Sequence, residues 1–225
     1  MHKLKNLAAL FAIGIAGCTT SLEQPAVSSA VTLPAHMTLG DSHLSDFYTF
    51  DSALAQPGKL LRQEPLNQQQ SNPGAGKNIR LLYSSTDGID GKDMIAVSGV
   101  LFLPIGDAPA GGWPLMAWTH GTVGIADICA PSWNGRQEQD RKHLQHWLEN
   151  GYAVVASDYQ GLGTPGTHPY LATRPEAYSN LDIIRAVQSA DFPVSKKVVL
   201  FGQSQGAGAA VATAGHAADY APDVN

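Results

Sequence analysis

Two kinds of hydrophobic pattern divide the chain. Residues 79–86 and 94–103 are rich in β-branched and aromatic residues, and the segment 87–91 between them contains two glycines, which permit the positive φ of a hairpin turn. Residues 59–66 form a candidate first strand, and the polar run 67–77 has the composition of a loop. The first half of the chain is therefore predicted to contain an antiparallel strand pair.

After Pro104 short apolar runs alternate with segments of helical spacing. The predicted strands are 115–119, 152–157 and 198–201, and the predicted helices are 139–148, 178–190 and 205–218. Continuous apolar strands that alternate with helices indicate a parallel sheet with helices on both faces. The fold class is therefore α/β, and chemistry is expected at the carboxyl ends of the strands.

Composition narrows the class of protein. The chain has 225 residues, 44% of them hydrophobic, and a formal net charge of -5, which fits one globular domain with a real core. The acidic balance argues against nucleic-acid binding, which requires a cationic face. Two cysteines are too few for a disulfide framework or a thiolate zinc site. No metal, organic cofactor or protein partner is predicted.

The first residues resemble an export signal. Lys3 and Lys5 precede an apolar run that is too short to span a membrane, and the signal is predicted to cover residues 1–17. The run ends at Cys18 in a pattern similar to the lipobox of bacterial lipoproteins. A lipidated Cys18 would anchor the exported protein to the bacterial envelope, with 18–45 as a tether; a plain secretory signal with an accidental cysteine is the alternative.

A candidate nucleophile lies where a strand meets a helix. Residues 202–206 read Gly-Gln-Ser-Gln-Gly, between the apolar run 197–201 and a helix that begins with small residues. Such an elbow exposes the hydroxyl of Ser204, and Gly202 and Gly206 are needed because a Cβ at either position would collide with the neighbouring strand or helix. A serine in an ordinary strand-to-helix loop is the alternative.

Acyl transfer also needs hydrogen-bond donors for the oxygen that becomes negative. The amide of Gln205 begins the helix and is predicted to be one donor. The loop after strand 115–119 supplies the second, from Thr122 with Gly121 as the neighbour that could share the role. His120 in the same loop is expected to brace it rather than to act in catalysis.

These motifs together resemble the secretory lipase family of the α/β-hydrolase fold. The resemblance rests on 202–206, 120–122 and the loop 158–170, and extends to 129–132 and 57–62. It covers the chain from about Asp46 onward, so that 46–225 is predicted to be a partial α/β-hydrolase domain. The family implies hydrolysis of carboxylic esters, with acylglycerols as substrates in lipid catabolism and no cofactor.

The family order of catalytic residues is serine, then aspartate or glutamate, then histidine. Residues 205–225 suffice for one helix, on which His216 would rise about 18 Å from Ser204. The resemblance implies that the acid, the histidine and the cap follow on later sequence, so that 46–225 is part of a hydrolase domain. The alternative function is a catalytically inactive lipoprotein domain.

Three further residues, and one cysteine, could contribute to the site or its stability. His168 and His120 are minor candidates for a substitute base, and Asp158 is expected to brace a loop. Cys129 is predicted either to have lost a disulfide partner with the later sequence or to be a buried free thiol.

Overall fold

The computed structural model of the protein describes residues 44–224. The predicted signal over 1–17, the candidate lipidation site Cys18 and nearly all of the predicted tether lie outside the described residues. Within the described part, no helix is both long enough and apolar enough to cross a membrane.

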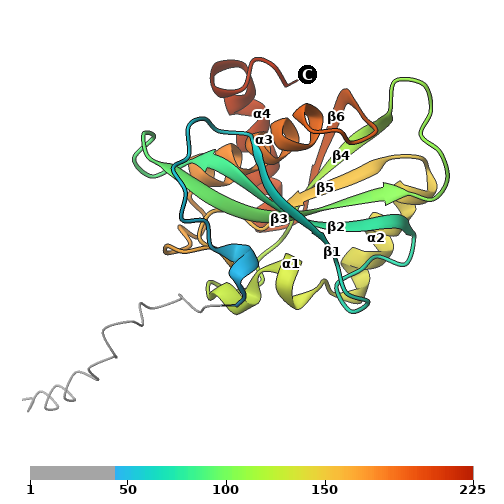
Figure 1. The fold of residues 1–225 in the computed structure, drawn as a ribbon, viewed down its shortest axis with the longest axis horizontal. Helices are drawn as coiled ribbons and strands as arrows, with labels where there is room; N and C mark the ends of the chain where they lie inside the picture. Colours follow the sequence, from blue (N-terminus) through green and yellow to red (C-terminus); the bar gives the residue numbers. More distant parts are fainter. Residues whose placement is uncertain (1–43, 225) are drawn as a thin grey trace, which may run out of the picture. The chain divides into compact units, whose positions relative to one another are not determined.

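A mixed six-stranded sheet organises the described residues (Figure 1). Its spatial order is β1-β2-β3-β5-β4-β6. The strands are β1 (Leu60–Pro65), β2 (Ala75–Thr86), β3 (Met94–Pro104), β4 (Trp113–Thr119), β5 (Ala153–Ser157) and β6 (Val194–Gly202). The predicted hairpin of β2 and β3 is confirmed, because the two strands pair antiparallel from Ala75 to Thr86. Strand β5 pairs antiparallel with β3 and parallel with β4, and β4 pairs parallel with β6.

Helices cover both faces of the sheet, as the strand and helix alternation predicts. They are α1 (Pro131–Asn134), α2 (Glu138–Glu149), α3 (Thr173–Ser189) and α4 (Gln205–Tyr220), with single 3-10 turns at Asp46–Tyr48 and Asp127–Cys129. Helices α3 and α4 lie on one side of the sheet, and α1 and α2 lie on the other (Figure 1). The α/β fold class is thereby confirmed.

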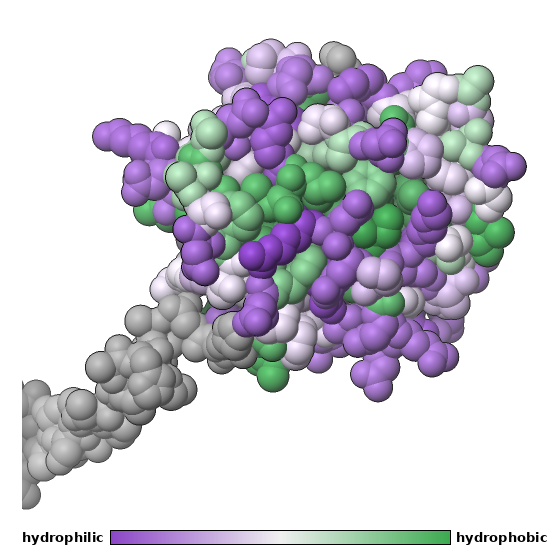
Figure 2. All heavy atoms as spheres, viewed as in Figure 1, coloured by the Kyte–Doolittle hydropathy of each residue, from purple (hydrophilic) through white to green (hydrophobic). Residues whose placement is uncertain are grey.

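Each helical layer has its own apolar core. One cluster joins Ile183, Ile184 and Val187 of α3 to sheet residues such as Leu101 and Val155. The second joins α2 to the opposite face of the sheet through Leu144 and other buried residues. On the face seen in Figure 2, hydrophobic residues lie between hydrophilic ones near the centre. The two cores fix the sheet, so that the strand ends hold constant positions for the loops that follow them.

Three predicted boundaries are wrong at their N-terminal ends. Helix α3 begins at Thr173 rather than at residue 178, because Pro175 lies in its first turn, where a missing N–H costs no hydrogen bond. Strand β6 begins at Val194 instead of 198, since its polar residues lie in a half-exposed strand. Strand β2 begins at Ala75, inside the expected loop.

Parallel pairing brings three strand ends to one edge of the sheet. Strands β4, β5 and β6 end at Thr119, Ser157 and Gly202, and run in the same direction. The loops that follow them therefore leave the sheet on the same side, where sites form in α/β folds.

Candidate active site

Ser204 occupies a strained turn between β6 and α4. Its backbone has φ 55° and ψ -122°, a conformation that L-residues rarely adopt, and the residue is exposed. The turn is closed by hydrogen bonds from the Gly206 amide to the Gln203 carbonyl at 2.9 Å and from the Ala207 amide to the Ser204 carbonyl at 2.9 Å. The hydroxyl therefore projects from a tight strand-to-helix junction toward solvent.

Both predicted elbow glycines lie in crowded positions. A Cβ on Gly202 would collide with the carbonyl oxygen of Gly206, and a Cβ on Gly206 would collide with the carbonyl oxygen of Thr119. The Thr119 hydroxyl also donates a hydrogen bond to the Gly206 carbonyl at 2.7 Å. The end of β4 therefore packs directly against the start of α4, and only glycine leaves room for this contact.

The Gln205 amide is the free donor of this turn. The next two amides, of Gly206 and Ala207, are used within the turn, whereas the Gln205 amide makes no backbone hydrogen bond within residues 44–224. As the first residue of α4 it also lies at the positive end of the helix dipole. An oxygen beside Ser204 would therefore meet an unused N–H group.

The loop after β4 lies against the elbow. A Cβ on Gly121 would lie 2.5 Å from Oε1 of Gln203, the residue before Ser204. In the described part of the chain neither Gly121 nor Thr122 uses its amide in a backbone hydrogen bond. Gly121, Thr122 and Gln203 also line a polar cavity of about 120 Å³ beside the start of α2. The structure thus brings both predicted donor regions together.

His120 is held inside this loop. Its Nδ1 lies 2.7 Å from the Gly121 carbonyl oxygen and its Nε2 lies 3.3 Å from the Asp158 carbonyl oxygen. Its ring stacks on Tyr159 at a centroid distance of 4.2 Å, and burial lowers the pKa of His120. These contacts match the bracing role expected for His120 and leave neither ring nitrogen free for Ser204.

Asp158 also braces the loops. The carboxylate is fully buried and accepts hydrogen bonds from the Ser132 amide at 2.9 Å, from the Ser98 hydroxyl at 2.7 Å and from the Ser132 hydroxyl. These contacts join the end of β5 to β3 and α1. The loop-bracing role expected for Asp158 agrees with this geometry.

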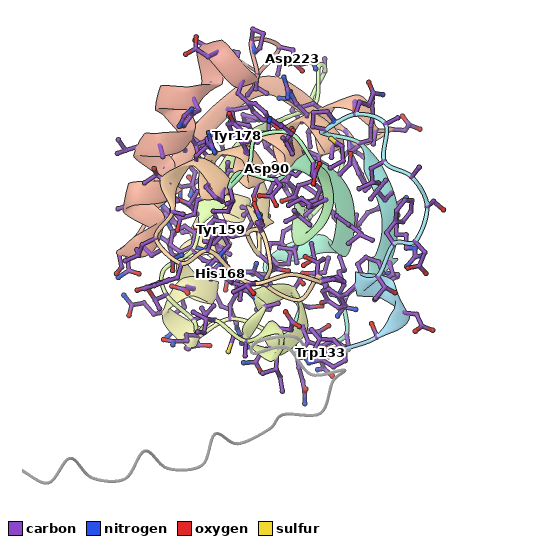
Figure 3. All side chains as sticks on the ribbon, turned by 90° about the vertical axis from the view of Figure 1, so that its left-hand side faces the viewer. Asp90, Trp133, Tyr159, His168, Tyr178 and Asp223 are labelled. Atoms are coloured by element: carbon purple, nitrogen blue, oxygen red, sulfur yellow. The ribbon has the colours of Figure 1, made fainter. Side chains whose placement is uncertain are left out.

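The long loop after β5 contains the remaining histidine candidate. Nδ1 of His168 donates to the Gln160 carbonyl at 2.8 Å, the side chain is buried, and burial lowers the pKa of His168. Tyr159 and His168 lie close together in Figure 3, with parallel rings at 6.3 Å. Farther along this loop, the Tyr170 and Thr122 hydroxyls lie 2.9 Å apart. The loop therefore contacts the segment after β4.

A buried glutamate beside the elbow was missed by the sequence analysis. Glu176, in the first turn of α3, is 2% exposed and accepts a hydrogen bond from Nε2 of Gln205 at 2.8 Å. The helix predicted from the sequence begins only at residue 178, so Glu176 lies outside it. Pro175 followed by an acidic residue is a signal for a helix start that would have placed Glu176 in this first turn.

Other chemistry is sparse in residues 44–224. This part of the chain contains no group of three or more His, Cys, Asp or Glu side chains that could hold a metal ion. Cys129 is a half-buried free thiol near Gly124. Among the described residues, the Ser204 hydroxyl makes no hydrogen bond to a histidine.

Comparison with known proteins agrees with the motifs. A family model described as secretory lipase matches residues 136–225. A curated relative, lipase A of Moesziomyces aphidis, is 26% identical over 92% of this chain and 47% of its own length.

The fold of this chain is also similar to the folds of solved lipase and esterase structures. Lipase A of Candida antarctica in its closed state has a TM-score of 0.68 and 25% identity, over 83% of this chain and 45% of that one. A rice cell wall degrading esterase, LipA of Xanthomonas oryzae, has a TM-score of 0.58 and 28% identity, over 74% of this chain and 47% of that one. The chain spans about half the length of these relatives. The resemblance predicted from the motifs is confirmed: the chain is similar to the secretory lipases, and its described residues have the α/β-hydrolase fold of the lipase A structures.

Proposed function

We propose that this chain carries the nucleophile and the oxyanion donors of a carboxylic-ester hydrolase. The observation that carries the proposal is the exposed Ser204 in a left-handed turn, beside the unused amide of Gln205. Backbone strain of this kind persists where the surrounding structure enforces it, and it is concentrated at active sites. A nucleophile that must approach a carbonyl carbon without obstruction is the use that explains this geometry best.

The proposed reaction has two steps. The Ser204 oxygen attacks the ester carbonyl while a general base takes the hydroxyl proton, and the carbonyl oxygen becomes an oxyanion held by the amides of Gln205 and Thr122, with Gly121 as the neighbouring donor. Collapse breaks the bond to the alcohol oxygen, which leaves with the proton and produces an acyl-enzyme. Water then attacks the acyl carbon and releases the carboxylic acid, and the proton returns to Ser204.

The general base is assigned to neither histidine of the neighbouring loops. The ring nitrogens of His120 lie against backbone carbonyls, and the ring of His168 is buried with Nδ1 bonded to Gln160. Their lowered pKa values follow from burial and need no catalytic role.

For the substrate we propose acylglycerols or related carboxylic esters. The match of residues 136–225 to secretory lipases and the likeness to lipase A structures support this class. An inactive binding domain is the second candidate, favoured by the lack of a histidine hydrogen bond to Ser204 among the described residues. The two candidates differ in whether the protein cleaves esters.

We also propose that the protein is exported, as the match to secretory lipases suggests. Anchoring through a lipidated Cys18 is a further proposal. Cys18→Ser should release the full-length protein from membranes, measured by fractionation after a high-salt wash. A variant that still pellets with membranes would contradict lipid anchoring.

The test of the proposed function is ester hydrolysis by the full-length protein and its Ser204→Ala variant. With a p-nitrophenyl ester, the variant should lose at least about 10³-fold in kcat/KM and keep its melting temperature nearly unchanged. Ser195→Ala, at the opposite end of β6, is the matched control and should keep full activity. Retained turnover in Ser204→Ala would refute the nucleophile, and an inactive wild-type protein would favour the binding domain.

A further inference from the structure

Glu176 is a buried carboxylate that has no cationic partner among residues 44–224. Its side chain is 2% exposed, and none of the ion pairs formed within residues 44–224 includes it. Burial is the main cause that raises the pKa of Glu176. A carboxylate in such a place costs free energy unless hydrogen bonds compensate. The hydrogen-bond partners of Glu176 must therefore compensate the cost of burying its carboxylate.

One partner of Glu176 belongs to the elbow. Nε2 of Gln205 donates to Oε1 of Glu176 at 2.8 Å, and Gln205 is itself only 7% exposed. The side chain of Gln205 is thus fixed to α3, while its own amide is the free donor beside Ser204. Fixing the side chain of Gln205 limits rotation of the peptide group that carries this amide.

A second partner of Glu176 belongs to the long loop after β5. The backbone amide of Leu171 lies beside the Glu176 carboxylate and lowers its pKa, against the larger effect of burial. Leu171 has a left-handed φ of 61°, so its backbone is strained. Such a conformation persists only where surrounding contacts hold it in place. The preceding residue, Tyr170, has its hydroxyl 2.9 Å from that of Thr122. The loop held by Glu176 therefore contacts the segment that carries the second donor.

We propose that Glu176 is a positioning residue for the oxyanion hole, because its carboxylate holds both the Gln205 side chain and the loop that contacts Thr122. This inference rests on the proposed function. Glu176 does not touch the reacting atoms. It keeps the two amide donors at the spacing that the oxyanion requires, and a displaced donor stabilises the transition state less.

The same helix offers a matched control. Asp182 is also a fully buried carboxylate of α3 with a pKa raised by burial. It binds Ser85 at 2.7 Å, Tyr220 at 2.6 Å and Arg185 at 3.2 Å, which are partners away from the elbow. A merely structural role for Glu176 predicts that the two carboxylates respond alike to substitution.

The experiment compares Glu176→Ala, Glu176→Gln and Asp182→Ala in the full-length protein. Rates are expressed per active site titrated with a fluorophosphonate. Glu176→Ala should lower kcat about tenfold or more with KM within about twofold. Glu176→Gln should recover most of kcat, since its amide oxygen still accepts from Gln205. Asp182→Ala should lower the melting temperature and leave kcat per titrated site unchanged.

Gln205→Ala removes the same hydrogen bond from its other side and keeps the backbone donor. It should lower kcat as Glu176→Ala does, and the double variant should be no slower than either single variant. If Glu176→Ala fails to fold, Gln205→Ala carries the test. Wild-type kcat in Gln205→Ala, or an equal loss of kcat in Asp182→Ala, would overturn the inference. Turnover by Ser204→Ala would instead overturn the proposed function itself.

Discussion

Two tight turns of this molecule take up left-handed backbone in different ways. In the hairpin between β2 and β3 the positive φ of 74° falls on Gly91, for which it costs little. In the elbow between β6 and α4 the positive φ of 55° falls on Ser204, which has a side chain. The hairpin therefore uses the residue best suited to its shape, whereas the elbow keeps a less suitable one for the sake of its hydroxyl.

The same contrast, between glycine and other residues at positive φ, holds across the whole described part of the chain. Within residues 44–224, the non-glycine residues with positive φ are Ser204, Tyr159 and Leu171. Tyr159 and Leu171 lie in the loop after β5, and Ser204 lies in the elbow after β6. Within residues 44–224, positive φ at a residue with a side chain is thus confined to the segments that follow these two parallel strands. Every other left-handed position in this part is a glycine.

The largest effect is expected from closing the elbow with a methyl group. Gly206→Ala should lower the free energy of unfolding by about 3 kcal/mol or more, because the new Cβ meets the rigid Thr119 carbonyl. Gly208→Ala in the same helix has open space around its Cβ and should raise stability by about 0.5–1 kcal/mol. Urea unfolding measures both changes, and similar values for the two variants would show that the elbow is not close-packed.

A smaller effect separates two inactive variants at the nucleophile. Ser204→Ala and Ser204→Gly both remove the hydroxyl, but only glycine relieves the left-handed φ. Ser204→Gly should therefore be more stable than Ser204→Ala by about 1 kcal/mol. The measurement is thermal and urea unfolding of the two variants side by side. Equal stabilities would mean that the elbow stores no backbone strain.

The reverse substitution tests the hairpin. Gly91→Ala places a methyl group at a positive φ, in ordinary van der Waals contact with the Arg174 guanidinium at 3.8 Å, so only the backbone conformation opposes it. It should cost about 1 kcal/mol of stability and leave ester hydrolysis unchanged, since the new methyl group contacts Arg174 and no residue of the elbow. Urea unfolding and an esterase assay provide the two readouts, and reduced kcat would link the hairpin to the site.

The smallest effect concerns pH. Burial lowers the pKa of His168 below its unfolded value of about 6.5, so the unfolded state binds a proton that the folded state does not. Tyr159, whose ring faces His168, has a phenol pKa that burial raises well above its usual value, so it does not titrate in this range. Stability contributed by the neutral ring is therefore present above about pH 6.5 and is lost as pH falls.

His168→Asn preserves a donor to Gln160 and removes this titration. The stability of the wild-type protein should fall more steeply than that of the variant between pH 7 and pH 5, by less than about 1.4 kcal/mol per pH unit. The raised pKa values of Glu176 and Asp182 increase the stability of the folded state as pH falls. This contribution is the same in the wild-type protein and in His168→Asn, so it cancels in the comparison. Parallel pH profiles from urea unfolding would contradict the lowered pKa.

The sequence predicts much of this architecture because its signals are local. The hairpin, the three parallel strands and the helix after Ser204 follow from apolar runs and glycines that lie next to each other in the chain. The site residues that the sequence does not reveal depend on contacts between distant segments. The bond between Glu176 and Gln205 joins residues 29 positions apart, and its burial depends on how α3 packs.

The start of α3 shows why such residues are missed. Thr173 to Ala177 lack the apolar spacing of a surface helix, because a polar residue, Glu176, occupies a buried position between Pro175 and Ala177, while Thr173 and Arg174 are exposed. Periodicity detects an amphipathic helix by its apolar stripe and is weak where a buried position holds a charged residue. Likewise, the sequence predicts that His120 braces its loop but does not reveal its two partners, the carbonyl oxygens of Gly121 and Asp158.

The most direct test of the account is the site of covalent reaction with a fluorophosphonate. The full-length protein is incubated with the probe, digested, and analysed by peptide mass spectrometry. A phosphonylated Ser204, formed at a rate that Glu176→Ala reduces, is the result expected from an exposed nucleophile between two amide donors. A modified serine elsewhere, in a protein that still hydrolyses esters, would contradict it.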